Sequence, residues 1–150
     1  MNPEIRSADD LRGIDSDWLA RDADDYVGLL STAGGGYTPE GFVQNLDAHV
    51  AAIDAILAWP RSTSAKFAPE LRAGFTNTWR LVAERGLFAF DSDFRGADFP
   101  GRPYCLVAAP ETPVTAAELP AIVVSVLSYM QYRRLQFATL TTISADLLQR

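Results

Sequence analysis

The stretch WLARDADDYVGLLSTAGGGYTPEGFVQNLDAHVAAIDAILAWP, residues 18–60, contains the patterns that decide the fold. Residues 18–21 and 26–32 are rich in strand-forming residues, and the acidic residues 22–25 between them favour a turn. Three glycines at 34–36 then interrupt the pattern. The sequence therefore predicts two strands in succession, followed by a break that leads into a helix.

The second half of the stretch predicts one helix over residues 38–60. Thr38 can cap its N-terminus, and Pro39 suits the first helical position. Pro60 ends the helix because proline lacks a backbone N–H and restricts the residue before it. The apolar residues that recur at helical spacing, and are expected to be buried, are Phe42, Leu46, Val50, Ile53 and Leu57.

Further along the chain, residues 61–68 are expected to form a loop, and Pro69 to open a second helix that Gly86 caps. Strands are predicted at 87–90, 104–109 and 135–143, with a turn-rich connection at 91–103 and a short polar end. Thr115 and Glu118 have the spacing of a capping box. Residues 119–130 fit a helix, which we favour, although their β-branched content leaves a strand open.

The order of these elements predicts an α+β fold, because strands precede the helices and further strands follow in pairs. We expect a small, mainly antiparallel sheet with two or three helices packed on one face. Residues 1–17 are polar and without period, so they are expected to form a loosely ordered N-terminal lead-in. Residues 18–150 are expected to form a single domain.

The composition indicates a globular protein with an acidic surface. Of the 150 residues 48% are apolar, and 19 acidic against 13 basic side chains give a formal net charge of -6. Such a field disfavours nucleic acid as a partner and favours a cationic one. A solvated surface that merely aids solubility is the alternative. The excess is concentrated in the N-terminal half, at Asp9, Asp10, Asp15, Asp17, Asp22, Asp24 and Asp25.

The location of the protein is inferred from its single cysteine, Cys105, which cannot form an internal disulfide. This favours a reducing compartment and predicts a cytoplasmic location. The N-terminal residues lack the basic and apolar regions of a signal peptide. The longest apolar run, residues 119–127, is too short to span a bilayer, so no membrane association is expected.

Side chains that could hold a cofactor or a metal are scattered. Tyr37 and Thr38 follow the three glycines, where a phosphate-binding loop requires a lysine and a hydroxyl residue. The aspartates of the 91–103 connection could chelate a divalent cation, but Arg95 and Arg102 occupy positions where a calcium loop requires ligands. No cofactor and no metal site are therefore expected.

Catalytic residues are not recognisable either. His49, the only histidine, is expected to pack on the helix over 38–60 rather than to act as a base. Cys105 falls within a predicted strand and is expected to be a buried thiol rather than a nucleophile. We therefore do not expect an enzyme.

Aromatic side chains in loops indicate a different kind of function. Loop aromatics beside Asp and Arg are the residue types that anchor protein interfaces, although they can also cover the ends of a core. The aromatic residues in predicted loops or at element ends are Tyr37, Trp59, Phe67, Phe94 and Phe99.

Two parts of the sequence, taken together, resemble a known group of proteins. The first is WLARD at 18–22 with VGLLSTAGGG at 27–36, and the second is GLFAFD at 86–91 with PY at 103–104, APETP at 109–113 and ELP at 118–120. In this order they are similar to small bacterial proteins, some of which resemble immunity proteins of polymorphic toxin systems. The resemblance spans residues 18–143 and implies a cytosolic protein that neutralises a toxin by binding it. It carries over no functional residue.

The leading hypothesis is therefore an immunity-type protein that blocks the active site of a cognate toxin, one with a basic cleft. One alternative is a small metal-dependent hydrolase that uses Asp91 and Asp93. Another is a non-catalytic regulatory module that self-associates, for example as a homodimer, through residues 119–130. The predicted partner-binding residues are Asp22, Asp24, Asp25, Tyr37, Asp91, Asp93, Phe94 and Asp98.

Overall fold

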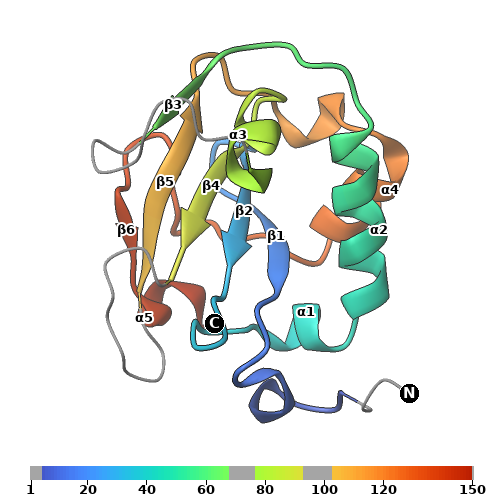
Figure 1. Cartoon of the computed structure of the whole chain (residues 1–150), viewed down its shortest axis with the longest axis vertical. Helices are drawn as coiled ribbons and strands as arrows, with labels where there is room; N and C mark the ends of the chain where they lie inside the picture. The colour runs from blue at the N-terminus through green and yellow to red at the C-terminus, as the bar shows by residue number, and fades with distance from the viewer. Residues whose placement is uncertain (1–4, 68–76, 93–102, 150) are drawn as a thin grey trace.

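The computed structural model describes residues 5–67, 77–92 and 103–149 (Figure 1). Strands and helices alternate irregularly along the chain. The elements are η1 (Ala8–Leu11), β1 (Asp17–Arg21), β2 (Val27–Ser31), α1 (Glu40–Val43), α2 (Leu46–Leu57), β3 (Ala65–Phe67), α3 (Thr78–Ala83), β4 (Phe88–Asp91), β5 (Tyr104–Pro110), η2 (Ala116–Glu118), α4 (Ala121–Leu127), β6 (Thr142–Ile143) and α5 (Ala145–Leu148).

The strands of the described residues form one sheet in the order β1-β2-β4-β5-β3, and β6 pairs with β5. Every neighbouring pair is antiparallel except β2 and β4, which are parallel. Parallel neighbours require the chain to cross back between them, and α1, α2, β3 and α3 lie in that crossover. The predicted α+β fold with a mainly antiparallel sheet is confirmed, as are the strands at 18–21, 26–32, 87–90 and 104–109.

The helices are distributed around this sheet as Figure 1 shows: α3 lies over β4 and β5, and α2 and α4 lie together beside β1. Residues 119–130 thus contain a helix, as favoured from the sequence, and η2 before it has the expected capping box of Thr115 and Glu118. Val123, Val126 and Leu127 of α4 are buried in the core.

The core is organised around Trp18 of β1, which is fully buried. Its indole Nε1 donates a hydrogen bond to the hydroxyl of Tyr104 at 3.0 Å, and that hydroxyl donates to the carbonyl of Tyr37 at 2.7 Å. Phe42 of α1 stacks on the same indole at a ring distance of 6.4 Å. This chain of contacts joins β1, β5 and the segment that enters α1.

The predicted helix over residues 38–60 is in fact two helices, α1 and α2, which Gln44 and Asn45 separate. Asn45 leaves the helical region with φ -136 and ψ 38, and its side-chain amide donates to the carbonyl of Gly41 at 2.8 Å. The expectation that Val50 is buried, which came from the single-helix pattern, is therefore wrong, since its side chain is 58% exposed. His49 is a packed helix residue, as predicted, but it is completely buried.

His49 explains how the outer edge of the sheet is closed. β1 is an edge strand, and the backbone N–H of Leu19 donates to Nδ1 of His49 at 3.1 Å. The N–H of Arg21 donates to the carbonyl of Met130, and the N–H of Tyr132 returns a bond to the carbonyl of Arg21. Unpaired strand edges invite aggregation. Here α2 and the chain after α4 occupy that edge.

The predicted strand over 135–143 is wrong, except for Thr142 and Ile143 in β6. Residues 132–141 instead turn around the end of β1, where the N–H of Ala23 donates to the carbonyl of Leu135. Phe137 is buried because it packs on Gly28 of β2, where an added Cβ atom would lie 2.9 Å from the ring. The apolar alternation of Leu135 and Phe137 therefore reflects burial without strand pairing.

Three other segments differ from the simple expectations. The predicted loop at 61–68 contains the edge strand β3, and the polar end contains α5. Within residues 5–17, Leu11 of η1 is buried in the core, and the N–H of Gly13 donates to the carbonyl of Gly34 at 2.8 Å. Of the predicted second helix only α3 and the turn at Gly86 are described, and residues 68–76 lie outside the described chain.

The buried histidine makes the stability of the fold pH-dependent. Burial lowers the pKa of His49 from 6.5 to about 4, so the folded state keeps the ring neutral while the unfolded chain protonates near 6.5. The unfolded state then binds more protons between these values, and the free energy of unfolding falls as pH is lowered through this window. The expected loss is roughly 3 kcal/mol.

This prediction is checked by urea unfolding of the wild type and of His49→Gln between pH 7 and pH 4. Burial raises the pKa values of Asp17 and Asp22, which act in the opposite direction, but both aspartates are present in both proteins. The wild type should therefore lose more stability than the variant on acidification. Equal losses would contradict the assigned role of His49.

Candidate functional site

The predicted binding residues that the structure describes lie at opposite ends of the sheet. The turn at 22–25, with Asp22, Asp24 and Asp25, joins β1 to β2 at one end. β2 and β4 run parallel and both end at the other, where Asp91 pairs in register with Ser31. Tyr37 follows β2 at that end. The structure therefore separates the aspartates of the turn from Tyr37 and Asp91, which the sequence alone could not place relative to one another. Asp93, Phe94 and Asp98 lie outside the described residues.

Asp22 is a structural residue in this fold, with 1% of its surface exposed. Its Oδ1 accepts the backbone N–H groups of Asp24 and Tyr26, both at 2.9 Å, and its Oδ2 accepts the N–H of Phe137 at 2.7 Å. Burial raises its pKa, while these hydrogen bonds act to lower it. The carboxylate thus fastens the turn to the chain after α4 and is almost entirely buried.

The remaining acidic residues of this turn are exposed. Asp25 has a positive φ of 63, and its carboxylate lies 3.6 Å from Nε of Arg21. A surface cavity of about 330 Å³ beside it is lined by Asp22, Ala23, Asp25, Gln131 and Arg133. Arginines therefore accompany the carboxylate of Asp25. Only Asp24 projects from the turn without an ion-pair partner among the described residues.

At the other end of the sheet, polar side chains are largely buried. Asp91 is 6% exposed, and Tyr37 is half-buried. The hydroxyl of Ser31 donates to Oδ1 of Asp17 at 2.6 Å and accepts a hydrogen bond from Nε1 of Trp79 at 3.1 Å. Burial raises the pKa of Asp17. These contacts fasten α3 to β2, so this polar group has a structural role.

The side chains most capable of chemistry also have structural positions. His49 accepts the N–H of Leu19 through Nδ1, so its neutral ring carries the proton on the buried Nε2. Cys105 is a free, buried thiol on β5. Among the described residues there is no group of three or more acidic, histidine or cysteine side chains that could hold a metal ion.

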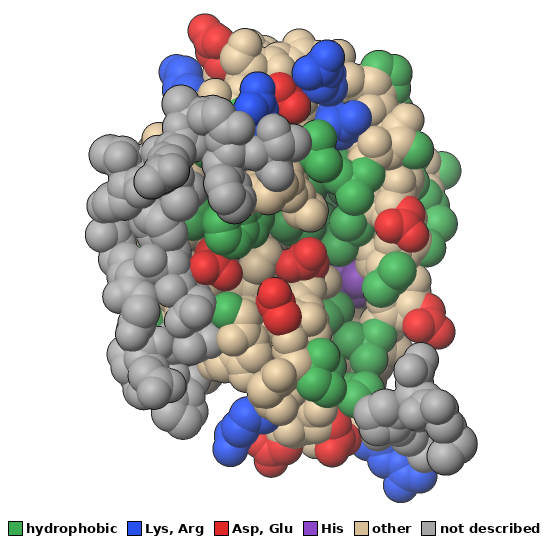
Figure 2. All heavy atoms as spheres, viewed as in Figure 1, with side chains coloured by type: hydrophobic (Ala, Val, Ile, Leu, Met, Phe, Trp, Pro, Cys, Tyr) green, Lys and Arg blue, Asp and Glu red, His purple; other side chains and the backbone are tan. Residues whose placement is uncertain are grey.

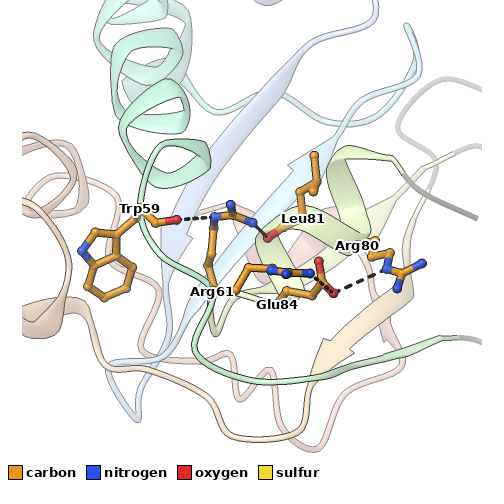
Figure 3. Close-up of polar contacts among 6 residues, drawn as sticks. Trp59, Arg61, Arg80, Leu81 and Glu84 are labelled. Atoms are coloured by element: carbon orange, nitrogen blue, oxygen red, sulfur yellow. Dashed lines mark hydrogen bonds and ion pairs between the residues drawn. The ribbon is translucent and has the colours of Figure 1, made fainter.

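Basic side chains gather at a different place, between α2, α3 and β3 (Figure 3). The carboxylate of Glu84 lies 3.6 Å from Arg61 and 3.5 Å from Arg80. Arg85 donates to the carbonyl of Trp59, just after α2, at 2.7 Å and to the carbonyl of Leu81, within α3, at 2.8 Å. A cavity of about 510 Å³ adjoins Arg61, Arg80 and Glu84. Since Glu84 lies between the guanidinium groups, their charge is partly neutralised.

The surface over α2 has a different composition. Figure 2 shows acidic and hydrophobic side chains on the right-hand side of the molecule, over α2, while basic side chains lie at its upper and lower ends. The sequence explains this separation, because no lysine or arginine occurs between Arg21 and Arg61. That run was a signal available from sequence alone. It is less conspicuous than the acidic excess, most of which lies in the clustered aspartates before residue 26.

No protein family, no curated protein and no solved structure gives a match to this chain. Within the residues that the structure describes, no helix is both long and apolar enough to cross a membrane.

The structural role assigned to Asp22 predicts a large loss of stability on truncation. Asp22→Ala leaves three backbone N–H groups without their acceptor, so the free energy of unfolding should fall by about 3 kcal/mol. Asp22→Asn retains one acceptor oxygen and should lose less. Asp24→Ala is the matched control, and it should change stability by no more than about 0.5 kcal/mol. Chemical unfolding of the four proteins measures these differences. A stable Asp22→Ala variant would return Asp22 to the candidates for partner binding.

Proposed function

We propose that this chain is an immunity-type protein that binds a cognate bacterial toxin and neutralises it by blocking the toxin's active site. The observation that carries the proposal is that the polar side chains fall into two groups, one buried and one facing solvent. The buried ones, such as Asp22 and His49, bond to the protein's own backbone, whereas other carboxylates face solvent without an ion-pair partner among the described residues. What the protein offers to other molecules is therefore a charged surface.

The net charge supports the same proposal. A protein with a formal charge of -6 attracts a partner whose contact surface is basic. Toxins that act on nucleic acids or nucleotides need basic clefts to hold phosphate groups. Complementary charge accelerates association with such a cleft and disfavours wrong partners. The resemblance of residues 18–143 to immunity-like proteins agrees with this mode of action.

The proposal predicts that the reading frame adjacent to this gene encodes a toxin. Expression of that toxin alone should stop growth, and co-expression of this chain should restore it. The purified chain should inhibit the toxin fully at a molar ratio of one chain to one toxin, because a blocked active site requires a stoichiometric complex. Titration of toxin activity against the chain measures this ratio, and Asp22→Ala, expected to be unstable, provides a control that should protect poorly at growth temperature.

Two results would contradict the proposal. In the first, the neighbouring product is not toxic, or its toxicity is unaffected by co-expression. In the second, the chain inactivates the toxin at ratios far below one. That outcome would indicate catalytic turnover and would favour an enzyme.

A further inference from the structure

We infer that the docking surface is the exposed face of α2 formed by Asp47, Val50 and Asp54, and that it binds a lysine- or arginine-bearing surface of the partner. The inference rests on the proposed function, since it names the contact surface of the same binding protein. We call these three residues the α2 face. The sequence instead predicted the 22–25 turn and the region around Tyr37 and Asp91.

The spacing of the three residues places them on one side of the helix. Asp47, Val50 and Asp54 are at positions i, i+3 and i+7 of α2, which are neighbours along one face. All three are exposed, and the side chain of Val50 is 58% exposed. The buried residues His49, Ala52, Ile53 and Ile56 form the opposite side. An apolar side chain thus lies between two carboxylates that face solvent.

The helices α1, α2 and α4 contain no lysine or arginine that could neutralise the α2 face. α1 and α2 fall within the run from residue 22 to 60, which has no lysine or arginine. α4, which packs against α2, has no charged residue, and it carries another exposed large apolar side chain, Ile122, at 43% exposure. Neither Asp47 nor Asp54 has an ion-pair partner among the described residues.

The alternative surfaces are less suited to a basic partner. At the 22–25 turn Asp22 is buried, Asp25 lies beside Arg21, and Arg133 adjoins the same cavity. At the other end of the sheet Asp91 is buried. Among the described residues, a basic cleft approaching the turn would meet one exposed carboxylate without an ion-pair partner, that of Asp24, whereas the α2 face presents two.

The chemistry of the α2 face defines the partner. Carboxylates at the rim of a contact steer a basic surface into place and govern mainly the rate of association. A small apolar residue between them gains binding energy when its exposed surface is removed from water. The face therefore fits a shallow apolar site flanked by lysine or arginine, as at the mouth of a phosphate-binding cleft.

The inference is tested with a catalytically inactive form of the adjacent toxin as the probe. Asp47→Lys/Asp54→Lys should lower the affinity at least tenfold, chiefly through slower association, and should reduce its dependence on salt. Asp47→Asn/Asp54→Asn should have a smaller effect in the same direction. The matched control is Asp24→Lys/Glu111→Lys, which makes the same change in net charge at exposed carboxylates elsewhere and should change affinity less than threefold. Thermal unfolding of each variant establishes that it is folded.

The outcomes separate the inference from the proposed function. If the wild type binds the toxin and the α2 variants bind equally well, the α2 face is not the docking surface, although the function stands. If the control pair alone weakens binding, the contact lies at the turn or near Glu111. If the wild type does not bind at all, the proposed function and the inference both fail.

Discussion

The outer edge of β1 and the turn after it depend on two side chains that bond to backbone. His49 of α2 accepts the N–H of Leu19, and Asp22 accepts three N–H groups, including that of Phe137. Through these contacts the edge strand holds both α2 and the chain after α4. Because a buried N–H without an acceptor is costly, neither side chain can leave its position without loosening the fold.

The parts of the fold that follow from local patterns were predictable, and those that depend on distant partners were not. The hairpin of β1 and β2, with its acidic turn, follows from composition alone. The break at Asn45 was not predicted because the apolar spacing continues across it. The structure shows it through the hydrogen bond from the Asn45 amide to the carbonyl of Gly41, and through the face of α2 that is buried, which contains His49 and not Val50. The segment around Phe137 alternates like a strand but is held by Asp22, more than a hundred residues away.

The same distinction applies to the candidate site. Residue type and net charge indicated acidic surfaces, yet a sequence does not reveal which carboxylates are buried. Asp22 and Asp91 belong to the interior, whereas Asp47 and Asp54 are exposed on α2, a helix without lysine or arginine. The acidic side chains that build the fold and those that face solvent are therefore different residues. This division is the physical basis for proposing a binding protein.

Hydrogen exchange of the backbone amides of Leu19 and Phe137 tests most directly whether these polar side chains are committed to the fold. If His49 and Asp22 hold these amides as described, both should exchange only through global unfolding, as slowly as the central strands β2 and β4. Exchange as rapid as that of an exposed loop would contradict the account. It would mean that the histidine and the aspartate are free for some other chemistry.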